Sequence, residues 1–139
     1  MPFRRILCAT DFSPASEAAV GFAASLADEA DACLLLVHVL AQNPDLEGPA
    51  RARLKRAFPP EAREWCLPDE IVTSGKAAPE ILRLAIEREA GLIVMGVHGR
   101  SLIDLMAFGS VTHQVVREAV CPVLTVRPEV AINQEGRAS

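Results

Sequence analysis

The chain has 139 residues, half of them hydrophobic, with one Trp and no Tyr, and a formal net charge of −4. We expect one domain, residues 1–139, with an aliphatic, alanine-rich core, because this length can bury a substantial single core. The acidic balance argues against a nucleic-acid-binding surface, which needs a concentrated basic face.

Hydropathy and cysteine usage favour a cytoplasmic protein without a membrane span. No apolar run reaches the roughly 18 residues of a spanning helix, and the first residues lead into a predicted strand rather than a signal peptide. Single cysteines in apolar runs behave as small buried hydrophobic residues, so we expect neither a metal site nor a disulfide framework. The cysteines are Cys8, Cys33, Cys66 and Cys121.

The first half of the chain alternates strand and helix. Residues 5–10 read as a strand, and a helix is predicted from Pro14 to about Ala30, with Ser13 as its N-cap. The continuous apolar run at residues 33–40 predicts a central strand.

A polar segment, residues 41–69, follows. A short basic helix is predicted to start near Gly48 and to be interrupted by Pro59 and Pro60, with a second helical piece at 61–65. A solvated helix face is the favoured interpretation of its basic side chains, and contact with phosphates or an acidic partner is the alternative. These side chains are Arg51, Arg53, Lys55 and Arg56.

The second half continues the alternation. Strands are predicted at 70–73, 91–95 and 122–127, and a helix at 79–89, where Arg83 and Glu87 are spaced as a surface ion pair. The polar tail, residues 128–139, is expected to be partly flexible. Strands alternating with helices predict an α/β protein with a parallel sheet, which binds ligands beyond the carboxyl ends of its strands.

A glycine-bearing stretch follows the fourth predicted strand. Gly96 and Gly99 lie in a loop, and Gly109 and Ser110 come just before a helical pattern. Glycines leave no Cβ between a ligand and the backbone N–H groups, which can then converge on an anion. Ser110 is expected to open the next helix, whose N-terminus also favours negative charge. The stretch therefore predicts a phosphate site.

The chain resembles the universal stress proteins of the nucleotide-binding type. The resemblance rests on residues 6–13, 35–39, 75–81 and 122–126, and most specifically on the spacing Gly96-x2-Gly99-x9-Gly109-Ser110. It implies an α/β fold with an open five-stranded parallel sheet in the order 3-2-1-4-5 and helices on both faces, Rossmann-like and similar to the adenine nucleotide alpha hydrolases. It also implies a homodimer.

The resemblance further implies a bound adenine nucleotide: ATP, with ADP or AMP as alternatives and Mg²⁺ left open. Asp11 and Gly96 would lie near the ribose, and the backbone of Val39 would bind adenine. Gly99, Gly109 and Ser110 would surround the phosphates. The other residues expected at the site, with less fixed roles, are Thr10, Met95, His98, Arg100 and Val111.

Two departures from the family pattern affect this site. The segment 41–69 is short and broken by prolines, which would open one wall of the adenosine pocket. Val97 occupies a loop position that is often small or hydroxylated in the family, which would remove one side-chain contact. Neither departure removes the backbone cradle for the phosphates.

Several of these residues have plainer interpretations. Asp11 could simply cap the first helix, although its expected position opposite the glycine loop favours a ligand role. His98 is expected to contact phosphate rather than to act as a general base, because no carboxylate partner is evident. His38 lies in an apolar strand and is interpreted as a satisfied core histidine. Arg100 could bind phosphate through two N–H groups.

Three functions follow from these features. The leading hypothesis is an ATP-binding regulatory protein of the stress response whose nucleotide state changes its interaction with an unknown partner. The second is an enzyme of the same fold, with at most slow ATP hydrolysis, because the chain lacks a Walker lysine loop and an evident carboxylate pair for Mg²⁺. The third is a dimeric interaction module without nucleotide. In each case pairing of the edge strand Val123–Val126 with a second copy is expected to form the dimer.

Overall fold

The structure, a computed structural model, describes residues 4–40, 44–97 and 102–128, with only the backbone path at 102–109. Strands and helices alternate along the chain, and two short 3₁₀ helices, η1 (Pro44–Leu46) and η2 (Pro60–Glu64), flank α2. The longer elements are β1 (Arg5–Ala9), α1 (Pro14–Ala30), β2 (Cys33–Leu40), α2 (Glu47–Ala57), β3 (Asp69–Ser74), α3 (Ala77–Glu87), β4 (Leu92–Gly96), α4 (Leu102–Glu118) and β5 (Val123–Val126).

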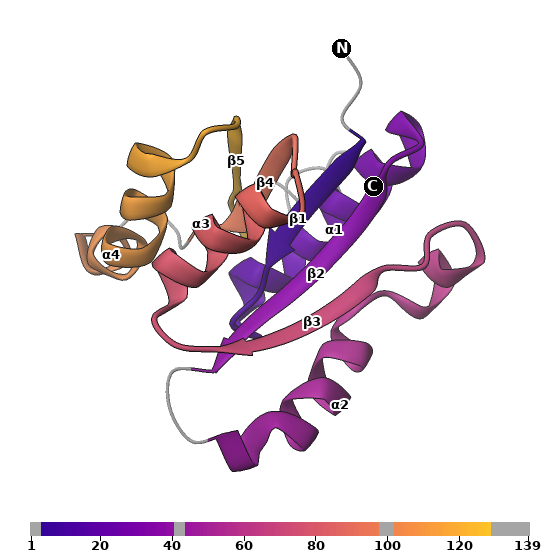
Figure 1. Cartoon of the computed structure of the whole chain (residues 1–139), viewed down its shortest axis with the longest axis horizontal. Helices are drawn as coiled ribbons and strands as arrows, with labels where there is room; N and C mark the ends of the chain where they lie inside the picture. The colour runs from indigo at the N-terminus through magenta and orange to yellow at the C-terminus, as the bar shows by residue number, and fades with distance from the viewer. Residues whose placement is uncertain (1–3, 41–43, 98–101, 129–139) are drawn as a thin grey trace.

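The strands form one parallel sheet in the order β3-β2-β1-β4-β5, which confirms the expected topology (Figure 1). β1 and β2 are central and nearly fully buried, as their continuous apolar runs predict for strands covered on both faces. The strand order reverses at β1, which pairs with both β2 and β4. A crevice is expected at this reversal.

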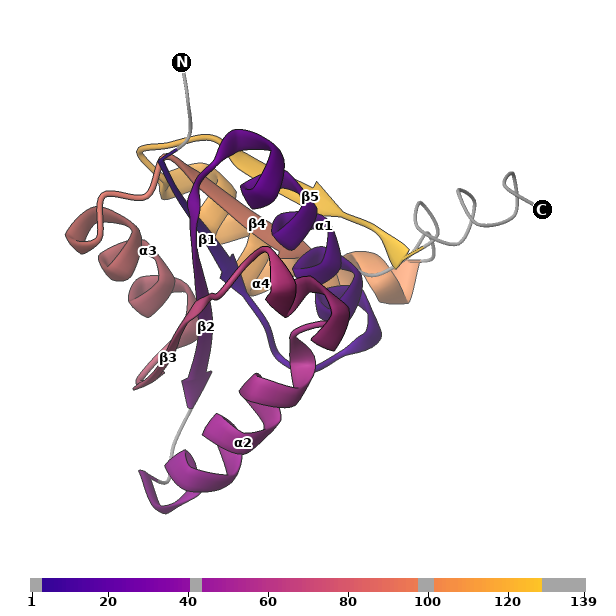
Figure 2. The same cartoon turned by 90° about the vertical axis from the view of Figure 1, so that its right-hand side faces the viewer.

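Helices cover both faces of the sheet, and the side chains of each strand alternate between two cores. Ile6 and Cys8 of β1 pack with α1 and α2, whereas Leu7 and Ala9 pack with α3 and α4. Figure 2 shows α3 and α1 on opposite sides of the strands. The first core contains Leu54 of α2, so this basic helix is anchored by an apolar face.

Most element boundaries follow local signals in the sequence. α1 spans the predicted residues, and Ser13 caps it by accepting a 3.2 Å hydrogen bond from the Ser16 N–H group. The helix ends at Asp31, whose φ of 55° lies in the left-handed region. The predicted surface ion pair between Arg83 and Glu87 is confirmed at 3.2 Å.

The start of α4 differs from the expectation. The helix begins at Leu102, so Ser110 lies inside it and does not open it. Residues 102–107 are mostly strong helix formers, Leu, Ile, Met and Ala, which extend the helix toward the loop. Gly109 is then an interior helical glycine, tolerated at a cost of about 1 kcal/mol. The N-terminal N–H groups of α4 therefore lie near Leu102.

Candidate functional site

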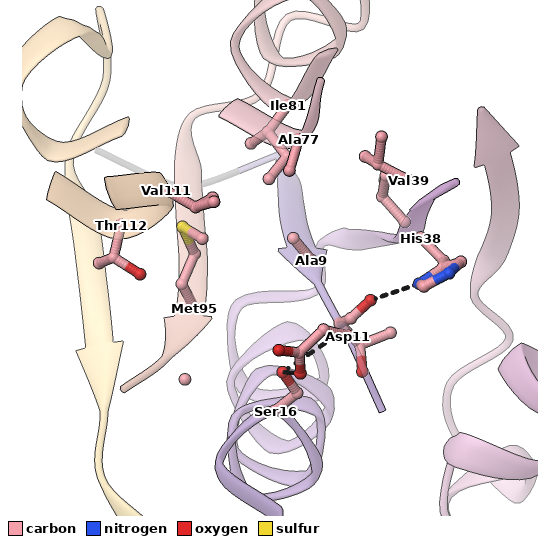
Figure 3. A pocket seen from close by; sticks show the side chains of 13 residues that line it. Ala9, Asp11, Ser16, His38, Val39, Ala77, Ile81, Met95, Val111 and Thr112 are labelled. Carbon is pink, nitrogen blue, oxygen red and sulfur yellow. Dashed lines mark hydrogen bonds between the residues drawn. The ribbon is translucent and has the colours of Figure 1, made fainter. Parts of the chain in front are cut away.

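A pocket opens at the carboxyl edge of the sheet, between the ends of β1, β2 and β4 and the helices α3 and α4 (Figure 3). It encloses about 670 Å³ of empty space, including its open mouth. Its lining residues are Ala9, Thr10, Asp11, Ser16, Val37, His38, Val39, Ala77, Ile81, Met95, Gly96, Val111 and Thr112.

One part of the pocket is apolar. Val39 comes from the end of β2, Ala77 and Ile81 from the first turns of α3, Met95 from β4 and Val111 from α4. Figure 3 shows these side chains around the upper part of the cavity, with Ala9 at its centre. Such walls suit a flat apolar ring, because they exclude water from its faces.

The opposite part of the pocket is polar and centres on Asp11. Its Oδ1 atom accepts a 2.6 Å hydrogen bond from the Ser16 hydroxyl and a 3.0 Å bond from the Ser13 N–H group. The Asp11 N–H group in turn donates to Ser16 Oγ at 3.2 Å. Asp11 is therefore tied to the first turn of α1, as expected of a helix-capping carboxylate, and it also lines the pocket.

These hydrogen bonds stabilise the charged form of Asp11. Burial raises the pKa of the carboxyl, but the bonds from Ser13 and Ser16 outweigh that effect and hold the pKa below its ordinary value. Asp11 is therefore ionised at neutral pH. The negative carboxylate at this wall repels phosphate groups. It can accept hydrogen bonds from hydroxyl groups, such as those of a ribose.

Gly96 positions β4 against α1. A Cβ atom at Gly96 would collide with the carbonyl group of Ala15 and would lie 2.7 Å from the Ser16 nitrogen. Only glycine therefore lets the end of β4 approach the first turn of α1 this closely. Because Ser16 holds Asp11, this contact also fixes the polar wall of the pocket.

His38 joins the pocket to the loop between β1 and α1. Its Nδ1 atom lies 2.8 Å from the Thr10 carbonyl oxygen, which only accepts, so Nδ1 carries the proton. The His38 ring also stacks on Phe12, with ring centroids 4.3 Å apart. Phe12 has a φ of 68°, which is uncommon for a bulky residue and occurs mostly where the surroundings enforce it.

The structure brings six of the expected site residues to one pocket: Thr10, Asp11, Val39, Met95, Gly96 and Val111. Ser110 is exposed, and the pocket lining in the described part of the chain does not include it. Gly109 lies within α4, one turn before the pocket residue Thr112. The expected residues His98, Gly99 and Arg100 lie outside the described residues.

Other lining residues were not expected from the sequence. Ala77 and Ile81 belong to the apolar face of α3, which sequence periodicity assigns to the core without showing that it extends past the sheet edge. Ser16, the third residue of α1, was missed, although its hydroxyl binds the Asp11 carboxylate. His38 is half-buried at the pocket wall, so its interpretation as a core histidine is incomplete.

The cysteines agree with expectation in part. Cys8 and Cys66 are buried, and burial raises the pKa of the Cys8 thiol to about 12, so it stays protonated and inert. Cys33 is exposed, because it stands at the first position of β2, beyond the cover of the helices. The expectation of burial was wrong for this residue.

The described residues offer neither a metal site nor a membrane-spanning helix. They contain no group of three or more His, Cys, Asp or Glu side chains placed to hold a metal ion. Among the helices in that part of the chain, none is both long and apolar enough to cross a membrane.

Comparison with known proteins agrees with this α/β architecture. Residues 2–127 match the model of the Universal stress protein family. A universal stress protein of Thermus aquaticus is 36% identical over 136 residues, which cover 90% of this chain and 99% of the relative.

Solved structures share the fold. A universal stress protein in complex with cAMP superimposes with a TM-score of 0.72 at 23% identity, covering 92% of this chain and 99% of that one. The universal stress protein from Archaeoglobus fulgidus in complex with dAMP gives a TM-score of 0.67 at 23% identity, covering 91% and 99%. The fold is thus that of a doubly wound α/β protein with a pocket at its strand-order reversal. The chain belongs to the universal stress protein family.

Proposed function

We propose that this chain binds an adenine nucleotide in the pocket at the carboxyl edge of the sheet and acts as a regulatory protein of the stress response. The observation that carries the proposal is the division of one pocket into an apolar slot and a polar wall around Asp11. This division matches a nucleoside, which has a flat base at one end and ribose hydroxyls at the other. The complexes of relatives with cAMP and dAMP support the same ligand class.

The base has hydrogen-bonding partners on β2. The Thr10 N–H group donates to the Val37 carbonyl, on the β1 side of β2, and the Gly75 N–H group donates to the Leu40 carbonyl, on the β3 side. The backbone groups of successive β2 residues therefore point alternately toward β1 and toward β3. By this alternation, the backbone N–H and C=O groups of Val39 face the β1 side, at the point where β1 has ended. They are therefore available to the edge of an adenine ring lying between Val39 and Ile81.

The ribose is assigned to the polar wall. In the described part of the chain, Oδ1 of Asp11 accepts the bonds from Ser13 and Ser16, which leaves Oδ2 to accept from ribose hydroxyls. By the sequence motif, the phosphates are proposed to bind at Gly99. Gly109 and Ser110, which the motif also names, lie inside α4 rather than at its N-terminus, so no phosphate is assigned to their N–H groups. ATP is the proposed nucleotide, with ADP and AMP as alternatives and Mg²⁺ as a partner of the phosphates.

Regulation fits this site better than rapid catalysis. Asp11 is the charged group of the described pocket, and its hydrogen bonds to α1 already give it a structural role. We therefore expect hydrolysis of ATP to be slow, and the bound nucleotide to act by changing the interaction of the protein with a partner. Pairing of β5 with β5 of a second copy is proposed to form a homodimer.

Calorimetric titration of nucleotide-stripped protein tests the proposal. We expect AMP and ATP to bind, and Ala77→Leu to weaken both at least tenfold, because the larger side chain fills the slot. Ala52→Leu is the matched control, since Ala52 is exposed on α2 away from the pocket. Absence of heat with every adenine nucleotide would contradict the proposal and leave a nucleotide-free dimeric module.

A further inference from the structure

A second groove lies beside the pocket, between the β1–α1 loop and α2. It is lined by Thr10, Phe12, Glu17, Arg53, Arg56 and Ala57, and it encloses about 470 Å³ of space, including its mouth. Thr10 lines both the groove and the pocket, so the two share one wall. In Figure 1, α2 lies below the sheet, on the side where β2 ends.

Within residues 4–40, 44–97 and 102–128, two arginines of the groove, Arg53 and Arg56, have no carboxylate partner. Other basic side chains of this region have carboxylate partners: Arg51 pairs with Glu47 at 3.0 Å, and Lys55 and Arg63 share Glu70. In the described part of the chain, neither Arg53 nor Arg56 forms an ion pair. Against them the groove offers one carboxylate, that of Glu17. The groove therefore carries an excess of positive charge on a protein that is acidic overall.

Stacking holds one of these arginines ready. The guanidinium carbon of Arg53 lies 4.3 Å from the centroid of the Phe12 ring. The His38 ring lies against Phe12 as well, with ring centroids 4.3 Å apart, so Phe12 contacts both the imidazole and the guanidinium. A guanidinium over an aromatic ring is attracted to the ring face and can still bind a carboxylate through two N–H groups.

We propose that this groove docks an acidic segment of a partner protein, with carboxylates bound by Arg53 and Arg56. A peptide fits better than a free anion, because the arginines lie at i and i+3 on one exposed helix face and can engage successive acidic side chains. The groove is open to solvent, so one small anion would gain little there over its hydration.

The groove is also connected to the pocket. The Phe12 N–H group donates to Thr10 Oγ1 at 3.0 Å, and His38 binds the Thr10 carbonyl. A ligand that contacts Thr10 and His38 therefore touches the residues that hold Phe12 and, through it, Arg53. On this basis, nucleotide in the pocket changes the affinity for the acidic segment, a step that rests on the proposed function.

Fluorescence polarisation with a short labelled peptide of alternating glycine and glutamate tests the groove without nucleotide. We expect binding that weakens about three- to fivefold in Arg53→Gln and in Arg56→Gln, and less in Arg53→Lys, which keeps the charge but not the planar fork. Glu17→Gln should tighten binding, because it removes the carboxylate that competes for the arginines. Arg88→Gln, at the far end of α3, is the charge-matched control and should change nothing.

Several results would overturn this proposal. The first is equal binding of a peptide with glutamine in place of glutamate. The second is equal weakening in Arg88→Gln, which would reduce the effect to net charge. The third is binding of inorganic phosphate that matches the peptide in affinity, which would make the groove a small-anion site. The fourth is unchanged peptide affinity in both Arg53→Gln and Arg56→Gln, which would show that these arginines do not bind the peptide.

The same titration with AMP or ATP present tests the connection. A change of about twofold or more in peptide affinity, lost in Phe12→Ala, is the expected result. Calorimetry separates the two levels of the account: nucleotide that binds without changing peptide affinity refutes the connection alone, and failure of nucleotide binding refutes the proposed function while leaving the peptide result to stand.

Discussion

Gly96 and Ser16 lie so close together that a Cβ on Gly96 would come 2.7 Å from the Ser16 nitrogen. The contact joins the end of β4 to the first turn of α1, and through Ser16 it fixes Asp11 at the pocket wall. A glycine of the sequence motif thus has a structural task that does not require a ligand.

Gly96→Ala is predicted to lower the free energy of unfolding by about 1–3 kcal/mol, because backbone atoms must move to admit the methyl group. Urea denaturation measures the change. Gly21→Ala in α1 is the control, since its new Cβ would meet no atom within 4 Å. That variant should gain about 0.5–1 kcal/mol from higher helix propensity. Similar losses in both variants would show that the close contact with α1 is not the cause.

Asp11 predicts a stability that depends on acid pH. Its pKa is lowered in the folded protein by the bonds from Ser13 and Ser16, so its contribution is complete above the unfolded pKa of about 3.9 and is lost as the pH falls through the folded value. The stability difference between wild type and Asp11→Asn should therefore shrink as the pH is lowered from 6 toward 3, in urea titrations. Glu61→Gln, which removes an exposed carboxylate on η2, should show no comparable trend.

Sequence patterns were sufficient for the sheet but not for every wall of the pocket. The continuous apolar run of β2 predicted a central strand, and the motif at Gly96 placed a site at the end of β4. The position of Ser110 inside α4 was not foreseen. The start of the helix depends on the mostly apolar residues 102–107, which are compatible with a helix or with a loop packed over the protein. Ile81 was missed because periodicity shows which face of a helix is buried, not what it faces beyond the sheet.

Asp31 supports a prediction about the end of α1. Its φ of 55° is unfavourable for a residue with a side chain, so Asp31→Gly should raise the free energy of unfolding by about 0.5–1 kcal/mol. Asp28→Gly, the same substitution inside the helix, should lower it by about 1 kcal/mol. Thermal unfolding of both variants checks the opposite signs, and equal signs would refute this account of the helix end.

The proposed dimer predicts a specific effect at the edge of the sheet. Ile93 N–H donates to the Pro122 carbonyl and Val97 N–H to the Val126 carbonyl, so even-numbered residues of β5 face β4. The N–H group of Thr125 then points to the free edge. Thr125→Pro should dissociate a dimer and leave the fold intact, whereas Leu124→Pro should damage the ladder itself. Sedimentation velocity decides this, and a wild-type monomer at micromolar concentration would refute the dimer.

The nucleotide site is the central claim, and amide chemical-shift mapping tests it most directly. Titration of ¹⁵N-labelled protein with AMP is predicted to shift the amides of Thr10, Asp11, Val39 and Ala77, which surround the slot and the polar wall. The amides of Arg5 and Arg88, at the opposite edge of the sheet, should stay in place. Saturable shifts confined to other surfaces, or no shifts at millimolar AMP, would contradict the account.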